Sequence, residues 1–102
     1  MKVKIPRQIK FLTHKYTIRF DEKELVSTGT IGLTRHLYQE LLLSKKTLPK
    51  SELDQVFLHE FVHIIERHMC VKLDDADVER ISEGFAELLF NNLDIEFDWG
   101  KI

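Results

Sequence analysis

The spacing of apolar residues changes at Pro49, and this change limits the folds that the chain can adopt. Before Pro49, over residues 7–20, apolar residues occupy every second position on either side of a THK turn, which is typical of a β-hairpin with one buried face. After Pro49, over about 51–70 and 75–92, they recur every three or four positions, as in helices. The order of these patterns predicts an α+β fold, with a small, mostly antiparallel sheet packed on two antiparallel helices.

Two more strands are predicted between the hairpin and the first helix. The segment DEKELVSTGTIG is interrupted by Gly29 and Gly32, and we interpret it as a loop leading into a strand over about 30–35. The apolar run LLL predicts another strand, over about 39–44, that is buried on both faces. All strands of the main sheet are therefore expected within residues 1–45.

The two predicted helices differ in how they begin. Ser51 and Asp54 are typical of a helix start, because the hydroxyl can accept from a free backbone N–H and the acid favours the positive helix end. An aspartate of KLDDAD is expected to cap the second helix. The apolar stripe of that helix is predicted to be Val78, Ile81, Phe85, Leu88 and Leu89. The alternating tail, 93–102, is expected to pack on the body through Ile95, Phe97 and Trp99.

The length and the cysteine content bound the class of protein. With 102 residues, we expect one domain, 1–102, with a core of its own, so a metal would serve chemistry rather than hold the fold together. The single cysteine, Cys70, cannot form an internal disulfide, which fits a reducing compartment. No segment has the continuous apolar run of a signal peptide or a membrane span. We therefore expect a cytoplasmic protein with no membrane partner.

Charge is distributed unevenly along the chain. Residues 1–50 contain 11 Lys and Arg against 4 Asp and Glu, whereas residues 51–102 contain 4 against 13. Opposite charges in two halves can attract each other within one fold. Basic residues of the first half alternate with apolar ones, as on the solvated face of a sheet, so we do not expect a nucleic-acid partner.

The stretch FLHEFVHIIERH contains His59, Glu60 and His63 within the most apolar segment of the chain. Positions four apart on a helix differ by about 40° in direction, so both imidazoles project side by side and can bind one ion. Glu60 points to the neighbouring sector, where it can act on a water molecule without being a ligand. Neutral imidazole nitrogens suit zinc, and a carboxylate can take the proton of its water. The pattern therefore predicts a catalytic zinc helix with Glu60 as general base.

A plainer interpretation is a pair of buried histidines that hydrogen bonds satisfy, with Glu60 at the boundary with solvent. Three such side chains inside a buried helix are costly without a partner, so their setting favours a metal site.

A catalytic zinc usually has three protein ligands and one open position. An extended histidine motif is excluded, because its glycine and third histidine would stand where the chain has Glu66 and Met69. No histidine follows His68. A downstream acid is therefore expected to be the third ligand.

Helix geometry narrows the choice among three glutamates of the second helix. If the helices are antiparallel and the turn is centred near Lys72, Glu83 falls level with the interval between the two histidines. Glu79 lies toward the His63 end. Glu87 lies just beyond His59 and could accept the outer N–H of its ring. This geometry favours Glu83 as a ligand, and the alternative for all three is a solvated acidic stripe.

These residues resemble the gluzincin metallopeptidases, in which an HExxH helix is followed by a glutamate ligand on the next helix. The resemblance lies in HEFVH and in the twenty-residue step from His63 to SEGFAE. The whole chain, from KVKIPRQIKF to LDIEFDW, is similar to short zinc metallopeptidases encoded by phages and prophages, which are distantly related to ImmA/IrrE-like proteases. The resemblance implies a minimal zincin-like fold. It implies His59, His63 and Glu83 as ligands of one zinc ion, Glu60 as general base, and Glu87 as the acid behind a ligand.

The resemblance also carries expectations about substrate binding. It implies that a strand near 40–44 borders the cleft and can pair with an extended peptide. Larger relatives have a second subdomain and a histidine or tyrosine that stabilises the oxyanion. The chain has no room for the subdomain, and we consider Tyr38, His36 and Arg35 as donors for the oxyanion.

The function that we expect is hydrolysis of a peptide or protein substrate by a cytoplasmic zinc enzyme. The alternative is a zinc-binding module that is weakly active or inactive and acts by binding another protein in a phage or prophage context. A third hypothesis, nucleic-acid binding through the basic half, has less support because those charges fit a solvated sheet face.

Overall fold

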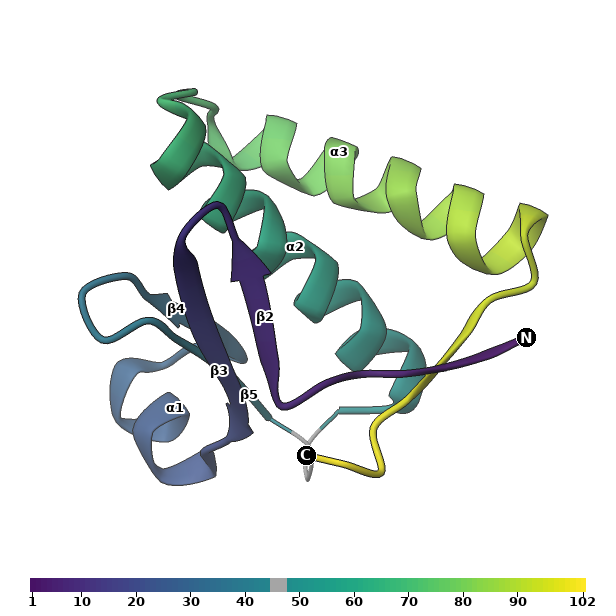
Figure 1. Cartoon of the computed structure of the whole chain (residues 1–102), viewed down its shortest axis with the longest axis horizontal. Coiled ribbons are helices and arrows are strands. Elements are labelled where there is room, and N and C mark those ends of the chain that lie inside the picture. The colour runs from purple at the N-terminus through teal and green to yellow at the C-terminus, as the bar shows by residue number, and fades with distance from the viewer. Residues whose placement is uncertain (45–47) are drawn as a thin grey trace.

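The four-stranded sheet, helix α2 and helix α3 are stacked in that order, so that α2 lies between the sheet and α3 (Figure 1). The computed structural model describes residues 1–44 and 48–102. The strands of the sheet, in spatial order, are β2 (Gln8–Phe11), β3 (His14–Phe20), β5 (Glu40–Leu43) and β4 (Gly32–Arg35). The outer pairs are antiparallel, and the central pair, β3 and β5, is parallel. The predicted α+β class, hairpin and strands are confirmed.

The two ends of the chain form a separate two-stranded sheet. Strand β1 (Lys2–Lys4) pairs in parallel with β6 (Glu96–Asp98), and the amino group of Met1 donates to the carbonyl of Asp94 at 2.8 Å. Phe97 and Trp99 are buried beside this pair, and Ile95 packs against the core. The prediction that the tail packs back on the body is confirmed, although nothing in the sequence pattern indicated the partner strand.

The segment predicted to be a loop at 21–29 forms a helix, α1 (Glu22–Thr28), so that prediction is wrong. Asp21 caps this helix, because its carboxylate accepts from the backbone N–H of Glu24 at 3.0 Å. Gly29 ends the helix with a φ of 70°, a left-handed conformation that glycine adopts without strain. The only buried residue of α1 is Leu25. One buried apolar residue in a helix of seven residues gives only a weak helical pattern in the sequence.

Helix α2 (Lys50–Met69) matches the predicted helix, but its start differs from the prediction. Pro49 is the N-cap, no side chain caps the helix, and Ser51 is exposed in the first turn. The Asp54 carboxylate instead accepts from the indole N–H of Trp99 at 2.7 Å and from the ammonium of Lys50 at 2.9 Å. Asp54 is therefore a buried link to the tail rather than part of a cap.

The second predicted helix is helical throughout, in two forms. Helix α3 (Asp75–Ala86) is capped by Asp74, which accepts from the N–H of Asp77 at 2.7 Å, as predicted. The last part, η1 (Glu87–Asn92), is a π-helix.

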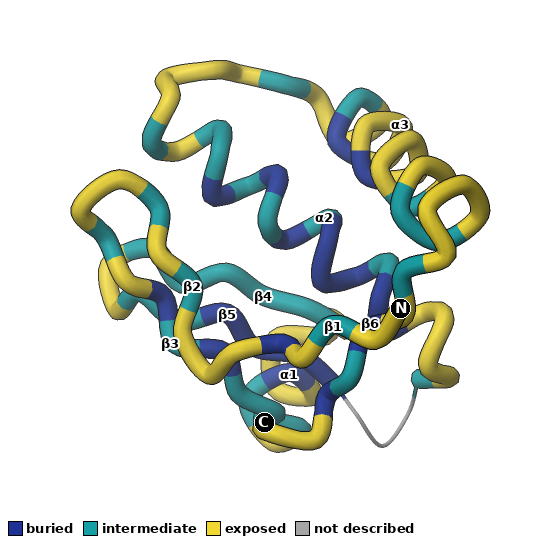
Figure 2. The backbone as a smooth tube through the Cα atoms, turned by 45° about the vertical axis from the view of Figure 1, so that its right-hand side comes forward, coloured by how far each residue is buried: buried dark blue, intermediate teal, exposed yellow. Residues whose placement is uncertain are grey.

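The predicted apolar stripe of the second helix is only partly buried. Val78 is fully buried, but Ile81, Phe85 and Leu88 are exposed, and most of the α3 tube is marked as exposed in Figure 2. The second fully buried side chain of α3 is Ser82, which lies against α2. The buried face of α3 therefore includes a small polar residue. A search for apolar residues at helical spacing does not detect such a face.

The core lies between the sheet and α2. Tyr16, Leu41 and Ile64 are fully buried, and the aromatic rings of Phe57, Phe97 and Trp99 meet edge to face. Every buried polar side-chain atom of the described residues has a hydrogen-bond partner. Packing therefore fixes the face of α2 that lies on the sheet. The directions of the side chains on the other faces of the helix are fixed as a result.

Candidate metal centre

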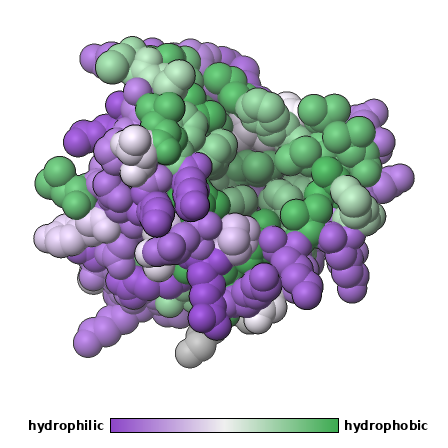
Figure 3. Space-filling model, viewed as in Figure 1, coloured by the Kyte–Doolittle hydropathy of each residue, from purple (hydrophilic) through white to green (hydrophobic). Residues whose placement is uncertain are grey.

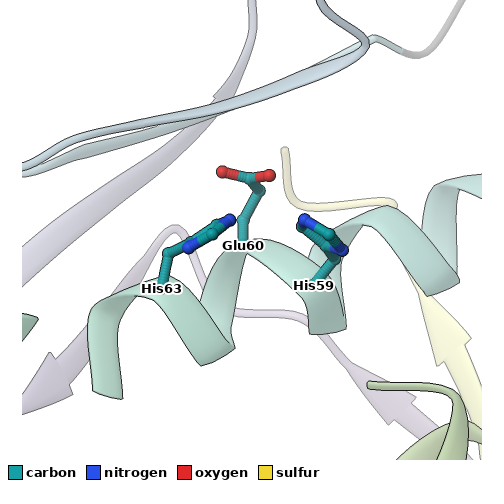
Figure 4. A group of neighbouring side chains, drawn as sticks. All are labelled: His59, Glu60 and His63. Carbon is teal, nitrogen blue, oxygen red and sulfur yellow. The ribbon is translucent and has the colours of Figure 1, made fainter. Parts of the chain in front are cut away.

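His59 and His63 lie one turn apart on α2, with ring centroids 5.0 Å apart (Figure 4). Both side chains are partly buried. Together with Glu60 they form a group whose potential ligand atoms all lie within 4.8 Å of one another, the one such group of three among the residues that the structure describes. The structure thus brings three of the predicted site residues together, in an arrangement that could hold a metal ion.

Each histidine has a carboxylate on its Nδ1 atom. Nδ1 of His59 donates to Glu79 Oε2 at 3.0 Å, and Nδ1 of His63 donates to Glu66 Oε1 at 2.8 Å. A carboxylate that accepts from one ring nitrogen fixes the tautomer and leaves the other nitrogen as a lone-pair donor. The Nε2 atoms of both rings are therefore the ones available to a cation.

Glu60 is 7% exposed and projects between the two imidazoles toward β4. The hydroxyl of Thr34 donates to its Oε1 atom at 2.9 Å. A Cβ atom added to Gly32 would collide with Val56 Cγ1 and would lie 3.3 Å from Glu60 Cγ. The lack of a side chain at Gly32 thus lets β4 approach α2 closely enough for Thr34 to hold the buried carboxylate.

Strand β4 is the edge strand beside this site. The resemblance implied that the strand near 40–44 could pair with a peptide, but β5 is hydrogen-bonded to β3 on one side and to β4 on the other. That expectation is wrong, because β5 has no free edge. A cavity of about 410 Å³ lies beside His59, and the segment before β4 with the first residue of that strand, Gly32, forms part of its wall. Its lining consists of Gly29, Thr30, Ile31, Gly32, Glu52, Gln55, Val56, His59, Glu60 and Glu79.

The two helices have a different register from the one predicted. Gln55 Nε2 donates to Ser82 Oγ at 3.4 Å, and His59 meets Glu79, so Glu83 lies level with the turn of α2 that precedes His59. Glu83 and Glu87 are both exposed, and Glu87 accepts from the side chain of Asn91. Among the described residues, Glu79 is the α3 carboxylate in contact with a motif histidine.

Glu66 explains the shift in register. The loop after α2 turns back on the last turn of the helix, because the N–H of Leu73 donates to Glu66 Oε2 at 3.1 Å and the N–H of Val71 donates to the Glu66 carbonyl. Helix α3 therefore begins alongside α2 rather than beyond its end. This contact, and the one with His63, were missed in the sequence, although Glu66 stands three positions after His63 and so on the same helix face.

Two of the three residues considered as oxyanion donors are engaged elsewhere. The guanidinium of Arg35 lies 3.6 Å from Glu40 and stacks over the ring of Tyr38, with 4.3 Å between Cζ and the ring centroid. Tyr38 is 69% exposed. His36, the third, is hydrogen-bonded through Nδ1 to the hydroxyl of Tyr16 at 3.1 Å.

Comparison with protein-family models, with curated proteins and with solved structures found no match for this chain. Among the described residues, no helix has the length and apolar content needed to cross a bilayer. The class that the fold and site define is thus an α+β domain with a His–Glu–His group able to hold a metal ion.

Proposed function

We propose that the chain is a zinc-dependent peptidase that hydrolyses an amide bond of a peptide or protein. The observation that carries this proposal is the pair of Nε2 atoms left open by carboxylates on Nδ1, beside the buried carboxylate of Glu60. A site that only bound a metal structurally would not need a buried, oriented acid next to its ligands. The fold class agrees with the proposal but does not by itself specify it.

The donor set fits zinc. Two imidazole nitrogens from one helix and a carboxylate from a neighbouring helix are typical of catalytic zinc sites, and the hydrogen-bonded carboxylates behind each ring are typical of zinc histidines. When bound, a zinc ion would supply a Lewis acid for the substrate carbonyl and would make water a better nucleophile at neutral pH.

The residues of this chain would then handle the substrate and the proton. Glu60 takes the proton of the attacking water and gives it to the leaving amine nitrogen, and Thr34 keeps the carboxylate in position for both transfers. The outer edge of β4 can add an extended peptide as a further strand, and the first residue of that strand, Gly32, lines the same cavity as His59 and Glu60.

The third ligand that the resemblance implies is Glu83, which stays a prediction. Glu79 accepts from Nδ1 of His59, so it would stand behind a ligand, the role that the resemblance gave to Glu87. The zinc affinity of a Glu83→Gln variant tests the third ligand, and that of a Glu79→Gln variant tests the support of the His59 ring.

The test of the proposed function is zinc content and proteolysis of the purified chain. We expect one zinc per chain, cleavage of unfolded casein, loss of zinc in His63→Ala, and retained zinc without cleavage in Glu60→Gln. Glu52→Gln is the matched control, because Glu52 also lines the cavity but has no contact with the histidines among the described residues. Full activity of Glu60→Gln would remove Glu60 from the reaction, and a wild type that binds no zinc would end the proposal.

One observation favours a second function, a zinc-binding module that acts by binding another protein. Ile81 and Phe85 of α3 and Leu88 of η1 are exposed, and Figure 3 shows apolar residues gathered over this part of the chain. Apolar patches of this kind often mark protein interfaces. A chain that binds zinc, does not cleave casein and loses a partner when Phe85 is changed to Ser would have this function.

A further inference from the structure

Three exposed apolar side chains form a stripe along the outermost helix of the molecule. They are Ile81 and Phe85 of α3 and Leu88 of η1, which continues the axis of α3 (Figure 1). Positions seven apart on a helix differ by about 20° in direction and positions four apart by about 40°, so the three side chains project on one side. The stripe is therefore a continuous apolar surface that faces solvent.

The stripe lies on the opposite flank of α3 from the metal centre. Val78 and Ser82 are the buried residues that face α2. From Val78, Glu79 lies about 100° round the helix in one direction, and Ile81 lies about 60° round it in the other. Because Glu79 is the residue that contacts His59, a molecule docked on the stripe leaves the cavity beside His59 open.

Gly84 interrupts the surface of α3 next to this stripe. Its φ is not positive, and a Cβ atom added to it would meet no heavy atom of the described chain within 4 Å. Glycine weakens a helix interior relative to alanine, and here neither backbone geometry nor packing within the chain requires it. What the missing side chain does provide is a hollow on an exposed helix, into which a side chain of another molecule fits.

Two opposite charges flank Gly84 on the side away from the stripe. Arg80 and Glu87 are both exposed and lie seven positions apart, so they point in nearly the same direction. Within one chain they are separated by about 10 Å along the axis, too far for an ion pair. Arg80 instead binds Asp77 at 2.9 Å, and Glu87 accepts from Asn91. With a cation before Gly84 and an anion after it, this surface is complementary to its own reversed copy.

We propose that α3 and η1 dock on the same helix of a second copy of this chain, antiparallel, with a twofold axis beside Gly84. In a twofold interface, if residue i of one copy meets residue j of the other, then j also meets i. An axis at this position sets Arg80 of each copy beside Glu87 of the other, which gives two equivalent ion pairs. This charge pattern is the reason that a second copy fits the stripe.

The apolar residues match about the same axis. Ile81 of one copy lies level with Leu88 of the other, and the Phe85 ring of each copy packs into the hollow at Gly84 of the other. The two metal centres stay accessible on the outer flanks of the helix pair. Docking needs no metal, so this inference is independent of the proposed peptidase function.

Sedimentation equilibrium of the full chain, with a chelator present to prevent bridging by metal, tests the association. A single helix pair is a small interface, so we expect a dimer that dissociates on dilution. Phe85→Ser should weaken the dimer at least about 10-fold, as expected for a central aromatic residue. Val26→Ser is the matched control, because Val26 is also exposed but lies on α1. A wild type that stays monomeric at about 1 mM, or equal association of Phe85→Ser, would overturn the proposal.

Gly84→Ala separates a contact between copies from a role within the chain. Alanine is the better helix former and meets nothing in its own chain, so the melting temperature of the dilute monomer should rise. The dimer should weaken about 10-fold, because the added methyl group fills the hollow that receives Phe85. A dimer of unchanged or greater strength would overturn the crossing at Gly84.

Exchange of the two charges tests the antiparallel order. Arg80→Glu and Glu87→Arg should each weaken the dimer about 3- to 10-fold, because each brings like charges together at two places in the interface. The double variant should return to within about twofold of the wild type, since the ion pairs form again with their signs exchanged. A double variant as weak as the single ones would overturn the antiparallel pairing, and circular dichroism checks that each variant keeps its helices.

Discussion

Two sides of helix α2 hold their partners by different means. On one side, His59, Glu60 and His63 each meet a polar group from another segment or the next helical turn, namely Glu79, Thr34 and Glu66. On the other, Phe57 packs edge to face on Phe97 and Trp99, and Phe61 packs on Phe11. The first side depends on the directions of its hydrogen bonds, and the second depends on the contact area of its aromatic rings. We therefore expect changes on the first side to affect metal binding and changes on the second side to affect the stability of the fold.

The largest expected effect is on the packed side. Phe57→Ala should lower the free energy of unfolding by about 3–5 kcal/mol, because it leaves a cavity beside the rings of Phe97 and Trp99. That is a large part of the roughly 5–15 kcal/mol typical of a domain. Urea unfolding measures the loss, and the folded fraction should still bind one zinc. A Phe57→Ala variant that is stable but binds no zinc would mean that the packed side of α2 also controls metal binding.

On the metal side, Glu79→Gln should weaken zinc binding about 10- to 100-fold, because it removes the carboxylate that orients His59. Glu83→Gln should stay within about threefold of the wild type, since Glu83 lies beside the preceding turn of α2. Competition with a chromogenic chelator measures both affinities. The opposite order would support Glu83 as the third ligand, as the gluzincin resemblance implies.

A smaller effect is expected for Thr34→Val, which keeps the shape of the side chain and removes the hydroxyl. The Glu60 carboxylate would lose a hydrogen bond worth about 1.5–3 kcal/mol as a bond to a charged group, of which we expect about 1 kcal/mol in unfolding. Casein cleavage should fall about tenfold with zinc affinity unchanged. Thr34→Ser should restore cleavage, and a loss of zinc in Thr34→Val would contradict a role limited to Glu60.

The smallest expected effect concerns pH. Burial, with nearby positive charge, lowers the pKa of both His36 and His68 in the folded chain. The unfolded chain then binds more protons as the pH falls below about 6.5, so stability is full above that pH and declines below it. Thermal unfolding between pH 7.5 and 5.5 measures the decline, which should be shallower in His68→Gln. Equal pH dependence in the variant would mean that other groups cause it.

The parts of the fold that local pattern controls could be predicted from the sequence. Apolar residues at every second position gave the hairpin, and the long apolar helix with two histidines four apart gave the group that the structure brings together. Helix α1 was missed because Asp21 and Gly29, rather than apolar spacing, define it.

The parts that tertiary contacts control could not be predicted in this way. The register of α3 depends on Glu66 binding the loop, and the position of Glu60 depends on Thr34, which stands 26 residues away in an unremarkable strand. A glutamate or a threonine in a sequence does not, taken alone, indicate such a contact. The parallel pairing of β1 and β6 likewise has no local cause, because its partners are separated by 94 residues.

That pairing has a mechanical consequence. Because β1 and β6 run in the same direction, a force drawing the amino end of β1 and the carboxyl end of β6 apart would slide the two strands past each other. Their backbone hydrogen bonds would then be stretched together instead of opening one after another. A chain pulled by one end, as during its unfolding for degradation, would resist at the β1–β6 pair before helix α2 was pulled.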